Sequence, residues 1–301
     1  MNTLQINDKF SPLVYEHIDV DIKPEEGIVW LSFDPHPRPC VTHQLIKDIR
    51  NLQQSIDLYS GRLLYDGRLV PIKYHVMDSR VPGVFSMGGD LAFFHQCIKD
   101  KDKQSMLEYG KACIDAIYPI MTNFNMPIVT ISLVRGDALG GGFEIALSSD
   151  VIIAERSTQM GFPEILFNLF PGMGAYQLLL QRLYPKDAEK MITNGKIYRA
   201  DDLYDMGIVD LLVEDGEGEE AVYSYIHSRE KHWNGYMAMQ EAKQKINPIN
   251  YDVLMDVCCN IWVEAAMNLT AKDLRVIERF VKAQNRKIQT FYDINTRQGN
   301  A

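Results

Sequence analysis

Several patterns that would assign a function directly are missing from this chain of 301 residues. None of the five cysteines belongs to a C-x-x-C pair, and neither H-E-x-x-H nor two histidines four residues apart occur. These absences argue against a disulfide framework, a zinc site or another metal centre. The odd number of cysteines is typical of a reduced, cytoplasmic protein; they are Cys40, Cys97, Cys113, Cys258 and Cys259.

Long hydrophobic runs and an excess of positive charge are also missing. No apolar run approaches the roughly 20 residues of a membrane span, and the N-terminus lacks the basic and then apolar pattern of a signal peptide. Acidic residues outnumber basic ones by 40 to 31, which gives a net charge of −9. The chain therefore has no overall basic field, and we expect it to bind neither nucleic acid nor a membrane.

What the sequence does contain is three consecutive glycines, Gly140-Gly141-Gly142, between a predicted strand and a predicted helix. Residues 127–134 are β-branched and apolar, as in a buried strand, and residues 144–149 are good helix formers. A strand that runs through glycines into a helix exposes backbone N–H groups at the positive end of the helix dipole. We expect a negative group, or one that becomes negative during a reaction, to bind there.

The three glycines do not match the other common glycine-rich binding motifs. The spacing G-x-G-x-x-G is absent and no Gly-Lys-Ser/Thr occurs, which argues against dinucleotide and P-loop sites. A tight turn without a ligand remains the simple alternative. Against it, a second glycine turn, Met87-Gly88-Gly89, follows another short apolar segment. One backbone N–H group from each turn could hold a single carbonyl oxygen, as in an oxyanion hole built without side chains.

Two glutamates accompany the glycine turns. Glu144 begins the helix after the three glycines, and Glu164 lies further along the chain. A glutamate at a helix start is usually a solvated residue that complements the helix dipole. Here both glutamates are bracketed by apolar residues, which is expected to raise their pKa values and to suit them to proton transfer near neutral pH.

The remaining pattern predicts an α/β chain in three parts. Residues 1–25 are predicted as an N-terminal extension, residues 26–215 as the core and residues 216–301 as a helical C-terminal region, with an acidic, glycine-containing linker at 214–220. Predicted strands are residues 27–33, 69–77, 127–134, 151–154 and 208–213. Predicted helices include one capped by Thr42, one around 102–124 and shorter ones at 178–183, 188–193 and 200–206.

In order and spacing, five segments resemble the crotonase (enoyl-CoA hydratase/isomerase) superfamily over roughly residues 25–215. The resemblance implies a repeated ββα spiral core with a helical C-terminal part, assembled as a homotrimer or hexamer. It also implies that no cofactor is needed and that the substrate is an acyl thioester on acyl carrier protein or CoA. The segments are residues 85–91, 136–147, 160–164, 171–174 and 200–213.

The same resemblance implies roles for the residues of the glycine turns. The N–H groups of Met87 and Gly141 would form an oxyanion hole, with Gly88 and Gly140 also contacting the substrate. Glu144 and Glu164 would be the catalytic pair. One-base isomerases of the superfamily normally keep a single glutamate, so the pair indicates a hydratase or dehydratase. Glu164 would remove the α-proton while Glu144 protonates the departing 3-hydroxyl, although the two roles could be exchanged.

A narrower resemblance, carried by residues 161–176, 259–266 and 283–286, is to the diffusible signal factor synthases. These bacterial enzymes make cis-2-unsaturated fatty acid signals by dehydrating a 3-hydroxyacyl group on acyl carrier protein and then hydrolysing the thioester. Met173, Trp262, Leu274 and Ile277 are candidates to line an acyl pocket, and for Met173 and Trp262 the resemblance supports this role. For Leu274 and Ile277, plain core packing is the alternative.

Three functions therefore stay open. The first is a dehydratase with thioesterase activity, and the second is an enoyl-CoA hydratase of fatty acid degradation. The third is a non-catalytic relative that binds a regulator such as a sensor kinase. Arg62, Arg68 and Lys73 are candidates for contacting an acidic carrier protein or a CoA phosphate, although a solvated surface is the simpler interpretation.

Overall fold

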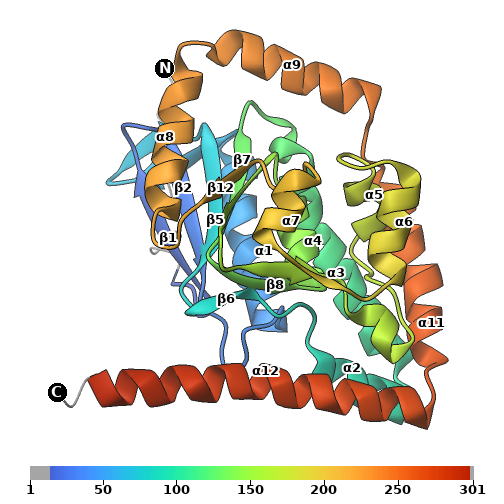
Figure 1. The fold of residues 1–301 in the computed structure, drawn as a ribbon. Helices are drawn as coiled ribbons and strands as arrows, with labels where there is room; N and C mark the ends of the chain where they lie inside the picture. Colours follow the sequence, from blue (N-terminus) through green and yellow to red (C-terminus); the bar gives the residue numbers. More distant parts are fainter. Residues whose placement is uncertain (1–13, 299–301) are drawn as a thin grey trace, which may run out of the picture.

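The computed structural model describes residues 14–298, and their side chains as far as residue 286. Its largest sheet has six strands in the order β1-β2-β5-β7-β9-β12 (Figure 1). Only β1 runs antiparallel to its neighbour, and the other pairs are parallel. The six strands are Ile18–Lys23 (β1), Ile28–Phe33 (β2), Tyr74–Ser79 (β5), Val129–Val134 (β7), Val151–Glu155 (β9) and Leu211–Val213 (β12).

Four short strands form a second sheet in the order β11-β10-β8-β6. The chain passes repeatedly from the first sheet to the second and then into a helix: β5 leads to β6 and α2, and β7 leads to β8 and α4. This is the repeated ββα arrangement of the crotonase fold, so the predicted fold class is confirmed. The elements are Gly83–Ser86 (β6), Gly136–Leu139 (β8), Gln159–Gly161 (β10), Ile197–Arg199 (β11), Leu91–Asp100 (α2) and Gly141–Leu147 (α4).

Helices cover both faces of the six-stranded sheet because its parallel strands are apolar on both sides. On one face, α1 (His43–Leu58), α3 (Lys103–Met121) and α4 share the larger core with side chains of β2 and β7. On the other face, Val222, Tyr225 and Ile226 of α8 (Gly218–Glu230) pack on the alternate residues of the same strands. Thr42 caps α1 by accepting the Leu45 N–H, as predicted.

The C-terminal third is helical. In Figure 1, α12 crosses one end of the molecule beside α2, whereas α9 lies at the opposite end. Within residues 14–298 no helix is both long enough and apolar enough to cross a membrane. The remaining helices are Ala175–Leu179 (α5), Pro185–Thr193 (α6), Ala200–Asp205 (α7), Trp233–Ile246 (α9), Tyr251–Asp256 (α10), a π-helical segment Val257–Trp262, Val263–Met267 (α11) and Ala271–Gln298 (α12), with 3-10 turns at Asn123–Asn125 and Glu164–Phe167.

Some expected elements differ from the structure. The strand expected at 69–77 is divided: β4 (Arg68–Pro71) pairs with β3 (Arg62–Tyr65) in a separate hairpin, and β5 starts only at Tyr74. Pro71, which has no N–H to donate, ends the hairpin strand. Part of the predicted N-terminal extension, residues 18–23, is the β1 edge strand, while residues 1–13 lie outside the described residues. The expected linker at 214–220 already contains the first turn of α8.

Candidate active site

The site is built where three parallel strands of the second sheet end. β8 pairs in parallel with β6 on one side and with β10 on the other, so the carboxyl ends of all three lie at the same edge. The two glycine turns and Glu164 directly follow these strand ends. The turns touch through their backbones, because a Cβ atom at Gly88, which has φ of 80°, would lie 3.0 Å from the nitrogen of Gly141. Only glycine fits there.

Each turn presents one backbone N–H group to the pocket. Among the described residues, neither the N–H of Gly89 nor that of Gly141 has a hydrogen-bond partner, and both glycines line the pocket. In the peptide unit of Gly89, the carbonyl of Gly88 accepts the N–H of Val41 at 2.8 Å. In the peptide unit of Gly141, the carbonyl of Gly140 accepts the N–H of Phe143 at 2.8 Å. These bonds fix each peptide plane and polarise the N–H at its other end.

Met87 was predicted to supply the first of these N–H groups, and that prediction is wrong. Its N–H donates to the carbonyl oxygen of Pro39 at 2.7 Å, which leaves nothing for a substrate. The free donor of this turn is Gly89, immediately before Asp90, whose carboxylate caps α2 by accepting the N–H groups of Ala92 and Phe93. Met87 still lines the pocket.

Glu144 lies in α4 and is 1% exposed. Its Oε1 accepts the N–H groups of Met173 at 2.7 Å and Ala175 at 2.9 Å. Burial raises the pKa of Glu144 to about 8, and the two N–H groups oppose that rise because they stabilise the carboxylate. Burial therefore keeps the proton on Glu144 to a higher pH than on an exposed glutamate, while the two N–H groups stabilise its ionised form.

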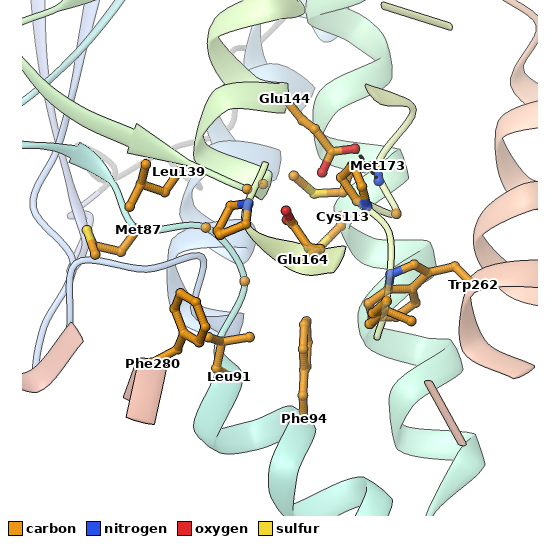
Figure 2. A pocket seen from close by; sticks show the side chains of 18 of the residues that line it. Met87, Leu91, Phe94, Cys113, Leu139, Glu144, Glu164, Met173, Trp262 and Phe280 are labelled. Atoms are coloured by element: carbon orange, nitrogen blue, oxygen red, sulfur yellow. Dashed lines mark hydrogen bonds between the residues drawn. The ribbon is translucent and has the colours of Figure 1, made fainter. Parts of the chain in front are cut away.

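Glu164 begins the 3-10 turn after β10, and its Oε1 lies against Gly140. Its Oε2 is buried and has no hydrogen-bond partner among the described residues. Burial, followed by the charge of Glu144, raises the pKa of Glu164 well above its usual range. Figure 2 shows both carboxyl groups pointing into one pocket. The structure therefore brings the predicted pair of glutamates together. Because the N–H groups of Met173 and Ala175 donate to Glu144, its ionisation is favoured over that of Glu164.

The rest of the pocket is mostly apolar. Met173 and Trp262 line it as predicted, whereas Leu274 and Ile277 do not. Trp262 is held by its Nε1–H, which donates to the carbonyl of Phe170 at 2.8 Å. Sequence reasoning missed several lining residues from α2, α3 and α12, which Figure 2 shows in part: Leu91, Phe94, Tyr109, Cys113, Phe280 and Gln284.

A helical pattern could have suggested two of these missed residues. Phe280 and Gln284 lie on the face of α12 that also carries Ile277, and a glutamine among apolar residues was the signal. Arg62 and Arg68 lie in the β3–β4 hairpin, and neither they nor Lys73 line the pocket. No three His, Cys, Asp or Glu side chains in the described part of the chain are grouped so as to hold a metal ion.

Comparison with known proteins agrees with this architecture. Residues 72–251 match the family model described as enoyl-CoA hydratase/isomerase. Mitochondrial methylglutaconyl-CoA hydratase of Homo sapiens is 30% identical over 175 residues, which are 57% of this chain and 49% of that protein. A protein of Arabidopsis thaliana described as probable enoyl-CoA hydratase 2, mitochondrial, is 28% identical over 225 residues, 74% of this chain and 68% of that one. The chain spans about half the length of the methylglutaconyl-CoA hydratases that it matches.

Two solved structures are similar throughout most of the fold. Enoyl-CoA hydratase from Bacillus halodurans has a TM-score of 0.71 and 17% identity, over 89% of this chain and 100% of that one. DspI of Pseudomonas aeruginosa has a TM-score of 0.65 and 22% identity, over 81% and 93% of the two chains. At these identities the two structures show a shared fold.

Proposed function

This chain belongs to the enoyl-CoA hydratase/isomerase family, and from that premise we propose that it adds water to, or removes water from, the C2–C3 bond of an acyl thioester. One observation carries the proposal: Glu144 and Glu164 enter one pocket beside the unpartnered N–H groups of Gly89 and Gly141. A carbonyl oxygen that becomes an enolate needs two such donors, and the carbon atoms next to it need an acid and a base.

The two N–H groups bind the thioester oxygen. As a proton moves at C2, negative charge builds on this oxygen, and donors that are already oriented stabilise it without reorganisation. Loss of one such donor commonly lowers the rate by about 10²–10³. The carbonyls of Gly88 and Gly140 keep both donors aimed, because each is anchored by its own hydrogen bond on the far side.

The positions of the carboxyl groups suggest their roles. Glu164 lies against Gly140, which precedes Gly141, and this supports a role at C2 of a thioester held by the Gly141 nitrogen. Glu144 then serves C3. As the pH rises, Glu144 ionises first, because Met173 and Ala175 donate to it. Hydration uses this state: Glu144 takes a proton from water and Glu164 protonates C2. Dehydration reverses both transfers.

Within this reaction class, we propose a 3-hydroxyacyl group on acyl carrier protein as substrate and a free cis-2-unsaturated fatty acid, used as a diffusible signal, as product. Thioester hydrolysis would use the same N–H pair, with a carboxylate activating water. One support is the resemblance of residues 161–176 to the signal synthases. The other is charge: Arg275, Arg279 and Lys282 are exposed on one face of α12, with no ion-pair partner among the described residues.

These cations follow each other at spacings of four and three residues, so they lie in line on the helix. They are concentrated on the helix that also lines the pocket through Phe280 and Gln284, in a chain of net charge −9. An acidic carrier domain matches this distribution.

We also propose that the protein is a homotrimer or hexamer. The exposed apolar side chains of Met239 and Ile246 on α9 fit this proposal, which light scattering of the purified protein tests directly.

The second candidate is an enoyl-CoA hydratase of fatty acid degradation, favoured by the names of the relatives. Mass spectrometry separates the two. The purified protein is given one 3-hydroxyacyl group as the carrier-protein thioester and, separately, as the CoA thioester. Release of free cis-2-enoic acid from the carrier supports the first proposal. Reversible formation of the trans-2-enoyl-CoA thioester alone supports the second, and no loss of water from either substrate contradicts both.

A further inference from the structure

Gln284 on α12 is a buried polar side chain that the chemistry above does not use. It is 1% exposed and lines the pocket. Its Nε2 donates to the carbonyl oxygens of Met87 at 3.1 Å and Gly89 at 3.2 Å. Because carbonyl oxygens can only accept hydrogen bonds, the amide nitrogen must face them. The amide oxygen Oε1 therefore points away from these two carbonyl oxygens.

This Oε1 atom is buried and has no hydrogen-bond partner in the described part of the chain. A buried acceptor without a donor destabilises a protein, and native structures contain few of them. Phe280, one turn earlier on α12, and Leu91 on α2 line the same pocket, and their apolar side chains cannot donate a hydrogen bond. A ligand that enters the pocket with an N–H or O–H group would satisfy Oε1.

We propose that Gln284 is a substrate-binding residue: its Oε1 accepts a hydrogen bond from an N–H or O–H group of the acyl thioester, while its Nε2 holds the turn that carries the Gly89 N–H. The inference rests on the function proposed above. Such a substrate carries two groups that can donate to Oε1. One is the 3-hydroxyl of the acyl chain, and the other is the amide N–H of the pantetheine arm near the sulfur.

Gln284 thus links substrate binding to the ordering of the turn that carries the Gly89 N–H. When the substrate donor reaches Oε1, the amide is fixed at both ends, and the carbonyls of Met87 and Gly89 are held more firmly. The turn that binds the thioester oxygen then loses freedom at the moment the substrate arrives. Since Gln284 belongs to α12, the C-terminal helix takes part in forming the binding site.

The test measures ligand binding without turnover. All proteins carry E164Q, and calorimetry gives Kd values for butyryl-CoA and 3-hydroxybutyryl-CoA. Q284M keeps the length of the side chain but removes its donor and acceptor, and N285A, at the exposed neighbouring position, is the matched control. Unchanged thermal unfolding of Q284M verifies that it folds.

We expect Q284M to weaken binding by about 3- to 10-fold, the range for one neutral hydrogen bond, with N285A unchanged. Greater weakening of 3-hydroxybutyryl-CoA than of butyryl-CoA identifies the 3-hydroxyl as the donor to Oε1. Equal weakening of both ligands excludes the 3-hydroxyl as donor, because loss of the Nε2 contacts to the turn acts on both ligands alike. Equal Kd values for Q284M and its parent overturn this inference and leave the proposed function standing. If the parent binds neither CoA thioester nor the same acyl groups on acyl carrier protein, the proposed function itself is overturned, and this inference with it.

Discussion

Replacing Glu144 by glutamine is expected to remove a pH-dependent loss of stability. In the folded protein, burial raises the pKa of Glu144 from 4.5 to about 8. A carboxyl group with a raised pKa holds its proton in the folded state after the unfolded chain has released it. Its stabilising contribution is complete below about pH 4.5 and is lost as the pH rises towards 8.

The size of this loss follows from the pKa difference. In the middle of this range each pH unit removes about 1.4 kcal/mol of the free energy of unfolding, and it removes less near pH 4.5 and pH 8, where the unfolded or the folded state is only partly ionised. Between pH 5 and pH 8, the buried Glu144 therefore destabilises the folded protein by about 3 kcal/mol. Glutamine stays neutral, can accept the same two N–H groups through its amide oxygen, and has no such dependence. We expect E144Q to gain about 3 kcal/mol relative to the wild type over this pH interval.

The assay is urea unfolding of wild type and E144Q at pH 5 and pH 8, at one protein concentration because assembly affects stability. The control is E25Q, which removes an exposed carboxylate far from the pocket lining. If E25Q gained as much stability as E144Q, the gain would not come from the buried site. If wild type and E144Q lose equal stability between pH 5 and pH 8, Glu144 does not hold its proton in the folded state, and the reasoning is refuted.

Three further predictions test other parts of the site. E164Q should leave the thermal unfolding midpoint at pH 6 unreduced but abolish hydration measured by enoyl absorbance, and a variant with wild-type turnover would remove Glu164 from the chemistry. G172A should lower stability by about 1–3 kcal/mol, because a Cβ there would lie 2.7 Å from the Trp262 ring; unchanged tryptophan fluorescence and unfolding would contradict this packing. R279E/K282E should raise KM for the carrier-protein substrate about tenfold and leave KM for the CoA thioester unchanged, and an equal effect on both would exclude docking on α12.

The pair of glutamates could be predicted because its signal is local. Each glutamate lies in an apolar segment next to a glycine turn or a short strand, and this arrangement requires little knowledge of the rest of the chain. The main strands β2, β7 and β9 were found for the same reason, since their buried residues are continuous in sequence. The four-residue strand β8 contains a glycine and an aspartate and gave no such signal.

The identity of the free N–H donor could not be predicted from the turn itself. It depends on the carbonyl of Pro39, which lies far away in sequence and occupies the N–H of Met87. The prediction that Leu274 and Ile277 line the acyl pocket was wrong for a similar reason. Periodicity gives the apolar face of α12, but it does not show which residues of that face meet the pocket. Phe280 and Gln284 line it and Leu274 does not, and this depends on the packing of α12 against α2.

The most direct test of the central claim follows the oxygen of water into the product. Wild type, E144Q and E164Q are incubated with a 2-enoyl-CoA in H₂¹⁸O, and the mass of the acyl product is measured by mass spectrometry. If the two carboxyl groups and the N–H groups of Gly89 and Gly141 catalyse hydration, the wild type forms a 3-hydroxyacyl product carrying ¹⁸O and neither variant does. Incorporation of ¹⁸O by E144Q or E164Q at the wild-type rate would contradict the account.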